Sequence, residues 1–344
     1  MNCNFKCIYC YEEEKYKIGT MNDDIIEGVL NFVKEKIKNS ENFSVTWFGG
    51  EPLLALKQIR KLTKGFKKIC KLNNCRYSAS MITNGYLLSS EVIRELSDLK
   101  VGFIQVTIDG PRNVHDRRRV LKNGGSTFDV IIKNLKNLIR NKKTIRVGLR
   151  VNVDKENMET AHEIFDIVKK EGLTTALSIS FGKVDRVYNS LNYSGDCFTI
   201  REYGKFLLDM MKKQSEAGVK IERHPVPMWH YCTADTFSGF VIDSVGYLYK
   251  CWNDVGRIEE HVGMINRTGF KSTPKLVRWL AWDPLENEEC LNCEILPNCM
   301  GGCPYFRMNA SEEEKCSSTL KYCLIEQLHL YYLSQKYFLI KKII

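Results

Sequence analysis

The chain has 344 residues, of which 44% are hydrophobic and 27% charged, a composition typical of a globular protein with one large or two medium domains. Its net charge of +10 is spread along the sequence, which favours a solvated basic surface over a patch for nucleic acid. The N-terminus is polar and no apolar run is long enough for a membrane span, so we expect a cytoplasmic protein without a secretion signal.

The 14 cysteines do not suit a disulfide framework, which is typical of small secreted domains. Three of them lie at the N-terminus, and eight lie between Cys232 and Cys323. This clustering favours metal binding. Cys70, Cys75 and Cys197 stand alone and are predicted to pack in the interior.

Helical and strand patterns alternate from residue 22 to about residue 217. Repeated βα units of this kind predict a parallel sheet with outer helices, either a barrel or a doubly wound sheet. In chain order, the predicted elements are helix Asp23–Lys38, strand Phe43–Phe48, helix Gln58–Lys71, strand Arg76–Ile82, helix Ser90–Asp98, strand Gly102–Ile108, helix Thr127–Arg140, strand Ile145–Val153, helix Met158–Glu171, strand Ala176–Phe181 and helix Ile200–Glu216.

Polar or glycine-bearing tripeptides follow three of these strands. They are Gly49-Gly50-Glu51, Thr83-Asn84-Gly85 and Asp109-Gly110-Pro111. Because the C-terminal ends of parallel strands form the active face of such sheets, we expect the chemistry to gather at one mouth.

The helix–strand alternation stops near residue 220, which predicts domains at 1–219 and 220–344. The stretch Phe237–Tyr249 alternates around Gly246 and predicts a hairpin. An irregular cysteine-rich stretch follows, and Leu320–Lys336 is predicted as a closing helix with a tail after it. A segment with so little regular structure needs cross-links to be stable, and metal clusters can provide them.

The first motif is Cys3-x3-Cys7-x2-Cys10, three thiols on a short loop. An iron–sulfur cubane normally takes four cysteines, so this spacing predicts a 4Fe-4S cluster with one iron left open for a non-protein ligand. A zinc loop with a distant fourth ligand, or chance clustering, is the alternative.

Together with Gly49-Gly50-Glu51-Pro52, this loop resembles the radical S-adenosylmethionine (SAM) enzymes. The resemblance implies a partial (β/α)6 TIM-like barrel, a SAM-binding 4Fe-4S cluster and cleavage of SAM to a 5′-deoxyadenosyl radical that abstracts hydrogen. The cofactor supplies the hard chemistry, and the protein orients and shields it. Gly49 and Gly50 would let backbone approach the SAM ammonium, with Glu51 in the same loop.

The stretch from Gln105 to Pro111, followed by His115-Asp116 and Arg117–Arg119, matches the same family. By this resemblance Arg119 pairs with the SAM carboxylate, for which a planar guanidinium is suited. The resemblance also places Thr107 near that carboxylate, Tyr9 near adenine, and Thr83 and Asn84 along the ribose.

The C-terminal cysteines resemble a SPASM domain, which in radical SAM proteins holds two auxiliary 4Fe-4S clusters. Two zinc sites are the alternative. The family's interleaving assigns the first auxiliary cluster Cys232, Cys251 and Cys303, and the second Cys290, Cys293, Cys299 and either Cys316, which we prefer, or Cys323. With three protein thiolates, the first cluster would keep an iron open for a substrate cysteine, unless Cys323 fills it.

SPASM-type enzymes act mostly on peptides or proteins. We therefore expect an oxidoreductase that matures a ribosomally made peptide, forming thioether cross-links at cysteines. The alternative is an anaerobic sulfatase-maturing enzyme, which makes formylglycine. Such enzymes usually have a catalytic aspartate directly after the cysteine that matches Cys251; here Trp252 stands there, and Asp254 could substitute.

The resemblance implies further partners and alternatives. A flavodoxin or ferredoxin is the expected low-potential electron donor, under anaerobic conditions. The N-terminal leader-binding domain and the first barrel strand of related maturases are not found before Cys3. A truncated chain, a misplaced start codon and a separate leader-binding partner are the three explanations. A non-enzymatic iron–sulfur electron carrier and a nucleic-acid-modifying enzyme are less favoured.

Overall fold

The computed structural model describes residues 2–12, 19–141, 145–185, 193–219, 221, 226–228, 232–310 and 315–343. The chain divides into two compact units, each discontinuous in sequence. Met1–Thr107, His115–Gly148 and Ser238–Arg278 form the first unit; Ile108–Val114, Leu149–Phe237 and Trp279–Ile344 form the second. The predicted domain boundary near residue 220 stays a prediction.

The main sheet has five strands in the order β2-β3-β4-β6-β7. They are β2 (Asn42–Trp47), β3 (Arg76–Thr83), β4 (Val101–Thr107), β6 (Arg146–Val153) and β7 (Ser178–Lys183). The pairs β2–β3 and β3–β4 are parallel. Parallel strands joined by helices confirm the predicted α/β class and are consistent with a partial TIM barrel, although five strands pair in the described residues rather than six.

The helices between these strands begin at or within two residues of their predicted starts, with one exception discussed below. They are α1 (Asp23–Lys36), α2 (Leu56–Leu72), α3 (Ser90–Asp98), α5 (Phe128–Asn141), α6 (Ile164–Lys170) and α7 (Ile200–Glu216). Local chemistry fixes the ends: the Asn22 side chain caps α1, and Thr199 with Glu202 forms a capping box on α7.

The helix predicted at Met158–Glu171 is wrong in its first turn, since a 3-10 turn at Ala161–Glu163 precedes α6. The Asn157 side chain explains the difference. It accepts a hydrogen bond from the Asp154 amide at 3.0 Å and donates to the carbonyls of Asp109 and Asn152, both at 3.0 Å. These bonds hold the chain in a turn that competes with the helix.

Two small sheets lie outside the predicted alternation. One sheet is an antiparallel pair of β1 (Phe5–Cys7) and β5 (Arg119–Leu121). Strand β5 directly follows the short helix α4 (Arg112–Arg118). A four-stranded sheet has the order β11-β10-β9-β8. Its β8–β9 pair confirms the hairpin around Gly246, whereas β10 and β11 were not predicted. The bounds are β8 (Val241–Ile242), β9 (Tyr247–Tyr249), β10 (Gly263–Asn266) and β11 (Gly269–Ser272).

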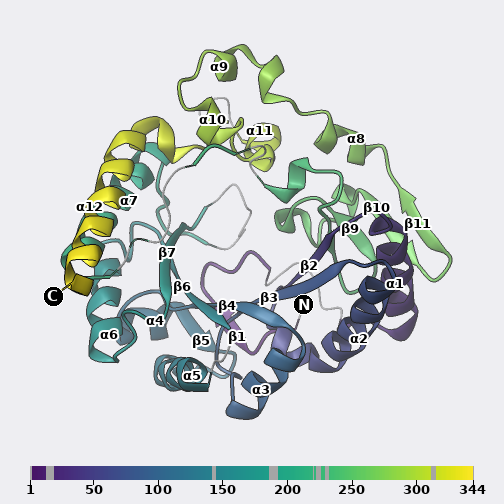
Figure 1. Ribbon diagram of the computed structural model, residues 1–344, viewed down its shortest axis with the longest axis horizontal. Helices are drawn as coiled ribbons and strands as arrows, with labels where there is room; N and C mark the ends of the chain where they lie inside the picture. The colour runs from purple at the N-terminus through teal and green to yellow at the C-terminus, as the bar shows by residue number, and fades with distance from the viewer. Residues whose placement is uncertain are drawn as a thin grey trace. The chain divides into compact units, whose positions relative to one another are not determined.

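The cysteine-rich stretch contains only short helices among its described residues: α8 (Lys275–Leu280), α9 (Glu288–Leu291), α10 (Leu296–Cys299) and α11 (Pro304–Asn309). The closing helix α12 (Leu324–Ile343) starts later than predicted and replaces the predicted tail. Within the first unit α1 lies beside α2, β10 and β11, and within the second α12 lies beside α7 (Figure 1). None of the described helices combines the length and apolar character needed to cross a bilayer.

Candidate active site

The three N-terminal cysteines lie on a loop that a short antiparallel strand pair supports. Strand β1 pairs with β5 so that Cys7 lies opposite Arg119. The Ile8 amide donates to the Arg118 carbonyl at 3.0 Å, and the Cys10 amide donates to the Cys7 carbonyl at 3.1 Å. This main-chain pairing fixes a loop that is too short to have a core of its own.

The three thiols are close enough to perturb one another. Burial is the main reason that the pKa of Cys10 is raised to about 12, and the charges of Cys7, Glu12 and Cys3 act in the same direction. Burial also raises the pKa of Cys3, against the hydrogen bond that its sulfur accepts from the Phe5 amide at 3.4 Å. Without a bound cation these thiols therefore stay protonated, and a metal that bound them would displace the protons.

Glu51 connects the ends of two strands to the N-terminal segment. It is 2% exposed. One carboxylate oxygen accepts from the Thr83 hydroxyl at 2.8 Å and the Leu53 amide at 3.0 Å, and the other accepts from the Asn84 amide at 2.8 Å. Burial raises the pKa of Glu51, and these three hydrogen bonds oppose that rise. The Glu51 amide donates to the Asn2 carbonyl at 2.9 Å.

The glycine pair after β2 adopts a backbone that favours glycine. Gly49 has φ 95° and Gly50 has φ 49°. The Gly50 amide donates to the Glu12 carboxylate at 2.5 Å. Just before the pair, the Phe48 ring meets the Trp252 ring edge-to-face at 6.0 Å. This loop therefore contacts both the cysteine loop and the segment that follows Cys251.

The residues at the ends of β3 and β4 also lie where the strand pattern predicts. Asn84 donates from Nδ2 to Asn4 Oδ1 at 2.8 Å, so it reaches the cysteine loop. Thr83 and Asn84 both bond Glu51, as described above. Thr107, the last residue of β4, is buried. Three of the predicted SAM-contact residues (Glu51, Thr83 and Asn84) are thus joined directly.

The three consecutive arginines differ in environment. Arg117 is exposed, while Arg118 and Arg119 are buried. Arg119 donates from Nη1 to the Tyr9 hydroxyl at 2.7 Å, and Arg118 lies over the Tyr9 ring at 5.0 Å. Arg119 also lies 5.7 Å from the centre of the Phe5 ring. The structure therefore brings the two predicted SAM-contact residues Tyr9 and Arg119 together.

Sequence reasoning gave no role to His115, which is fully buried. Its Nε2 lies 3.0 Å from Thr127 Oγ1, and that hydroxyl donates to the Arg119 carbonyl at 2.7 Å. Since the hydroxyl hydrogen goes to Arg119, the imidazole is the donor to Thr127. Burial, followed by the charge of Arg119, lowers the pKa of His115 well below its usual value, so the ring is neutral. Asp116 accepts from the amides of Thr127 and Phe128 at 2.8 and 2.9 Å.

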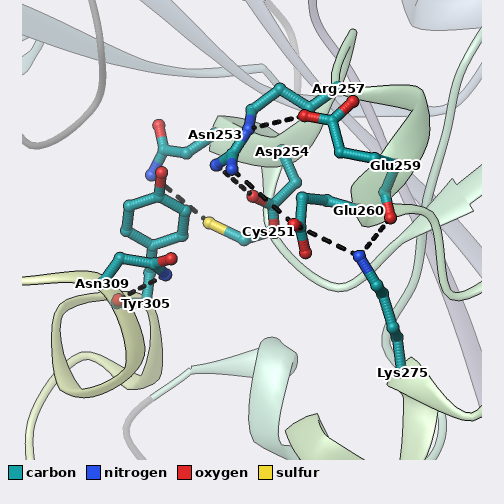
Figure 2. Close-up of polar contacts among 9 residues, drawn as sticks. All are labelled: Cys251, Asn253, Asp254, Arg257, Glu259, Glu260, Lys275, Tyr305 and Asn309. Carbon is teal, nitrogen blue, oxygen red and sulfur yellow. Dashed lines mark hydrogen bonds and ion pairs between the residues drawn. The ribbon is translucent and has the colours of Figure 1, made fainter.

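The predicted catalytic residue Asp254 is buried and already engaged. Its carboxylate forms an ion pair with Arg257 at 3.3 Å, and its amide donates to the Cys251 carbonyl at 3.2 Å. Cys251 Sγ accepts from Asn253 Nδ2 at 3.3 Å. Figure 2 shows the guanidinium of Arg257 shared between Asp254 and two further carboxylates, Glu259 and Glu260. To act as a base, Asp254 would have to leave this pairing.

Tyr11 lies near both cysteine segments of the first unit. Burial raises the pKa of its phenol well above the usual value, and the charges of Glu12, Cys10 and Cys251 add to the rise. Cys10 and Cys251 are therefore close to the same ring. The sequence offered no signal for this, because 240 residues lie between the two cysteines.

Four cysteines gather in the second unit, namely Cys290, Cys293, Cys299 and Cys316. Burial raises the pKa of Cys290 and of Cys299. The charges of Cys316 and Cys293 also act on Cys290, and those of Cys316, Cys290 and Cys293 act on Cys299. This is the set that the sequence assigned to the second auxiliary cluster with Cys316 as the preferred member.

Two further cysteines of the second unit lie near each other. Burial is the main cause that raises the pKa of Cys232 to about 11, and the charge of Cys303 acts in the same direction. The Cys303 amide donates to the Ser317 hydroxyl at 2.9 Å, which ties its loop to the chain beside Cys316. Cys251, the third predicted ligand of this set, belongs to the first unit.

Cys323 has a different environment. It is 2% exposed, donates to the Thr319 carbonyl at 3.1 Å and accepts from Gln327 Nε2 at 3.0 Å. Its sulfur lies next to Gly204 of α7. These contacts are those of a residue packed between helices. Cys70 and Cys75 are likewise buried at the end of α2, as predicted for packing cysteines.

Among the described residues, no group of three or more His, Cys, Asp or Glu side chains has the arrangement of a site for a single metal ion.

The chain matches known proteins over most of its length. Residues 1–168 match the Radical SAM superfamily. The Fe-coproporphyrin III synthase of Methanosarcina barkeri is 25% identical over 225 residues, 64% of this chain and 52% of that protein. The radical SAM cyclopropyl synthase TigE of Paramaledivibacter caminithermalis is 24% identical over 331 residues, 88% of this chain and 65% of that protein. The chain thus spans between half and two thirds of the length of these two relatives.

A third relative is matched almost end to end. The cysteine-type anaerobic sulfatase-maturating enzyme of Clostridium novyi is 22% identical over 349 residues, covering 92% of this chain and 90% of that protein. Among solved structures, native anSMEcpe with bound AdoMet has a TM-score of 0.72 at 21% identity, covering 100% of this chain and 97% of that one. SuiB of Streptococcus suis, bound to precursor peptide SuiA, has a TM-score of 0.64 at 13% identity, covering 92% and 74%.

The structural matches establish the fold. Residues 1–168 match the Radical SAM superfamily, and the chain is similar to anaerobic sulfatase-maturating enzymes over most of its length.

Proposed function

We propose that this chain is a radical SAM oxidoreductase that matures a ribosomally made peptide by forming thioether cross-links at cysteines. The observation that carries the enzymatic part is the gathering of Cys3, Cys7 and Cys10 with a buried Glu51 and a buried Arg119 in one unit. An electron carrier would need the thiols but not the polar residues around them.

The residues have distinct proposed roles toward the cofactors. Cys3, Cys7 and Cys10 would hold the SAM-binding 4Fe-4S cluster. When bound, this cluster and SAM supply one-electron cleavage to a 5′-deoxyadenosyl radical, which removes a hydrogen atom from the substrate. Arg119 would bind the SAM carboxylate, with the Tyr9 hydroxyl fixing its guanidinium.

The remaining contacts would orient SAM. Gly49 and Gly50 would leave room for close approach of the SAM ammonium, and Thr107 would lie near the carboxylate. Glu51 already bonds Thr83 and Asn84, so we propose that it holds these two in place along the ribose rather than acting alone.

The second unit would hold auxiliary 4Fe-4S clusters. We propose Cys290, Cys293, Cys299 and Cys316 as ligands of the second one, supported by their mutual proximity. Cys232 and Cys303, which lie near each other in the second unit, are the proposed ligands of the first. The helix packing of Cys323 supports a first cluster with an iron left for a substrate cysteine.

The peptide substrate is proposed from two comparisons. SuiB was solved with its precursor peptide, and anSMEcpe was solved with a Kp18Cys peptide. A thioether requires a radical at a peptide carbon and a thiolate nearby, and an auxiliary cluster with an open iron would hold that thiolate. A flavodoxin or ferredoxin would supply the electron, and a separate protein could bind the leader.

Sulfatase maturation is the second candidate, favoured by the near-complete match to the Clostridium novyi enzyme. It needs a base near the substrate, and Asp254 is the proposed one. The pairing of Asp254 with Arg257 speaks against this role. Asp254→Asn separates the two candidates, because it should abolish formylglycine formation in one case and leave thioether formation within a few-fold in the other. Glu259→Gln is the control, since it changes the same charge network at an exposed carboxylate.

The first experiment is anaerobic reconstitution with iron and sulfide, followed by dithionite and SAM. We expect 5′-deoxyadenosine from the parent chain and none from Cys7→Ala. Cys197→Ala is the matched control and should keep the activity. Peptide products then decide the substrate: a thioether removes two hydrogens per link, whereas formylglycine reacts with hydrazines. A parent chain with an intact cluster that yields no 5′-deoxyadenosine would refute the proposal.

A further inference from the structure

The guanidinium of Arg307, on α11, is fixed against one of the gathered cysteines. Its Nη2 donates to Cys290 Sγ at 3.0 Å, and its Nε donates to the Gly301 carbonyl at 3.1 Å. Its plane lies over the Trp282 ring, with Cζ 5.3 Å from the ring centre. Together these three contacts fix the orientation of the guanidinium, so that one N–H group points at the Cys290 sulfur.

The acceptor for Arg307 Nε comes from an unusual loop. Met300, Gly301 and Gly302 have φ values of 45°, 80° and 77°, three consecutive residues in the left-handed region. A Cβ on Gly301 would lie 2.8 Å from the Pro284 side chain. Such a backbone persists only where its surroundings determine it. The Gly301 carbonyl is therefore a rigid anchor for Arg307.

The sulfur that Arg307 contacts belongs to a group of four thiols. Burial raises the pKa of Cys290, and the charge of Arg307 is the largest influence that opposes the rise. At Cys299 the hydroxyl of Ser318 acts in the same way against burial. The site thus has a permanent positive charge at one sulfur and a neutral donor at another.

We infer that Arg307 is a positioning residue that raises the reduction potential of the second auxiliary cluster through its charged hydrogen bond to Cys290. The inference rests on the proposed function, namely on Cys290, Cys293, Cys299 and Cys316 as ligands. A cluster gains negative charge on reduction. Donors to its sulfurs therefore stabilise the reduced form more than the oxidised form.

Arginine suits this task better than lysine would. Its planar fork can bond Gly301 and Cys290 at once and stack on Trp282, whereas an ammonium is a single point charge on a flexible stem. Arg307→Lys therefore keeps the charge but loses the geometry, and Arg307→Gln loses both.

The test measures the reduction potential of the second auxiliary cluster by EPR-monitored redox titration of the full chain. To isolate its signal, the titrations use a background in which Cys7 and Cys232 are replaced by Ala, so that the SAM-binding cluster and the first auxiliary cluster are absent. We expect the potential to become more negative in Arg307→Gln, with Arg307→Lys between that variant and the parent. Lys321→Gln removes the same charge at an exposed position of the second unit and should not move the potential.

The outcomes separate the inference from the proposed function. If the parent chain binds no iron at the four cysteines, the proposed auxiliary site fails. If the cluster assembles in both Arg307 variants and the potential equals that of the parent, the inference alone fails. Loss of the cluster from both Arg307 variants, with Lys321→Gln intact, would also overturn it, because Arg307 would then be a structural anchor.

Discussion

The Thr127 hydroxyl donates to the Arg119 carbonyl at 2.7 Å and accepts from the fully buried imidazole of His115. On its other side Arg119 lies opposite Cys7 in the β1–β5 pair. The residue proposed to bind the SAM carboxylate is therefore fixed from both sides of its main chain, by the cysteine loop and by the start of α5. Thr127, and behind it His115, therefore support Arg119 through its main-chain carbonyl.

The first prediction concerns this chain of hydrogen bonds. Thr127→Val should lower stability by about 1–3 kcal/mol, because it leaves the His115 N–H and the Arg119 carbonyl buried with a lost partner. It should also weaken SAM binding several-fold, since Arg119 is less well placed. Thr127→Ser keeps the hydroxyl and should retain most of the stability and most of the affinity for SAM. Thermal unfolding and equilibrium dialysis with SAM measure the two effects; equal losses in the two variants would contradict the prediction.

The second prediction is a pH dependence of stability. An unfolded imidazole has a pKa of about 6.5, and burial lowers the pKa of His115 well below that value in the folded protein. Below about pH 6.5, His115 is therefore protonated in the unfolded chain but stays neutral in the folded chain. The free energy of unfolding falls as the pH falls, because protonation stabilises the unfolded state. Above that value the contribution of His115 is constant.

His115→Gln removes this titration and keeps a donor for Thr127. Its melting temperature should therefore fall less steeply than that of the parent between pH 6.5 and the onset of acid unfolding. The comparison with the parent cancels the titration of other groups, including Glu51. Parallel curves for the two proteins would show that His115 does not titrate as the structure indicates.

Much of the fold and part of the candidate site could be predicted from the sequence. The strand-end rule predicted that Glu51, Thr83 and Asn84 meet at one mouth, and their hydrogen bonds join them there. Cys7 came from the cysteine spacing and Arg119 from the family resemblance. The βα pattern likewise predicted the sheet. The partners of His115 could not be predicted, because the contact depends on how α4 and α5 pack, and a hydroxyl at Thr127 looks like an ordinary helix start. The β10–β11 pair was missed because Met264 and Ile265 are adjacent apolar residues and break the alternation that indicates a strand.

The third prediction tests Glu51 as the centre of the site. Glu51→Gln keeps the size of the side chain, but its amide NH2 cannot accept, so at least one of the bonds to Thr83, Leu53 and Asn84 is lost. We expect a loss of about 1–3 kcal/mol in stability and slower or incomplete cluster assembly at the N-terminal loop. Glu41→Gln makes the same change at an exposed carboxylate, so it should change neither the stability nor the cluster assembly. Thermal unfolding and iron analysis give the readouts, and a Glu51→Gln protein that matches Glu41→Gln in both would contradict the prediction.

The fourth prediction separates Cys316 from Cys323. Cys316→Ala should remove a thiolate from the second auxiliary cluster and lower its iron content, because Cys316 acts on Cys290 and Cys299. Cys323→Ala should leave the iron content and the Mössbauer spectrum unchanged and lower only the stability, since it empties a packed position beside α7. A lost protein ligand at the first auxiliary cluster in Cys323→Ala would show that this cluster has no iron left open for the substrate.

The last prediction concerns the loop between Cys299 and Cys303. A Cβ on Gly302 would lie 2.9 Å from Ser317 Oγ and 3.8 Å from Cys299 Sγ, at a φ of 77°. Gly302→Ala must therefore displace Ser317, whose hydroxyl accepts from the Cys303 amide, and with it the two cysteines that the loop joins. Gly218→Ala is the matched control, because Gly218 has a φ of 70° and nothing within 4 Å of its Cβ position.

The control should cost only the left-handed backbone penalty, about 1–2 kcal/mol, and should keep its iron. Gly302→Ala should cost more than the control and should lose iron from the second unit. Both effects follow from one cause, since the same hydroxyl supports the backbone of Cys303 and occupies the space that a Cβ would take. Melting temperatures together with iron and sulfide analysis of the two variants measure the difference, and equal iron content would show that the loop can shift without disturbing the cysteines.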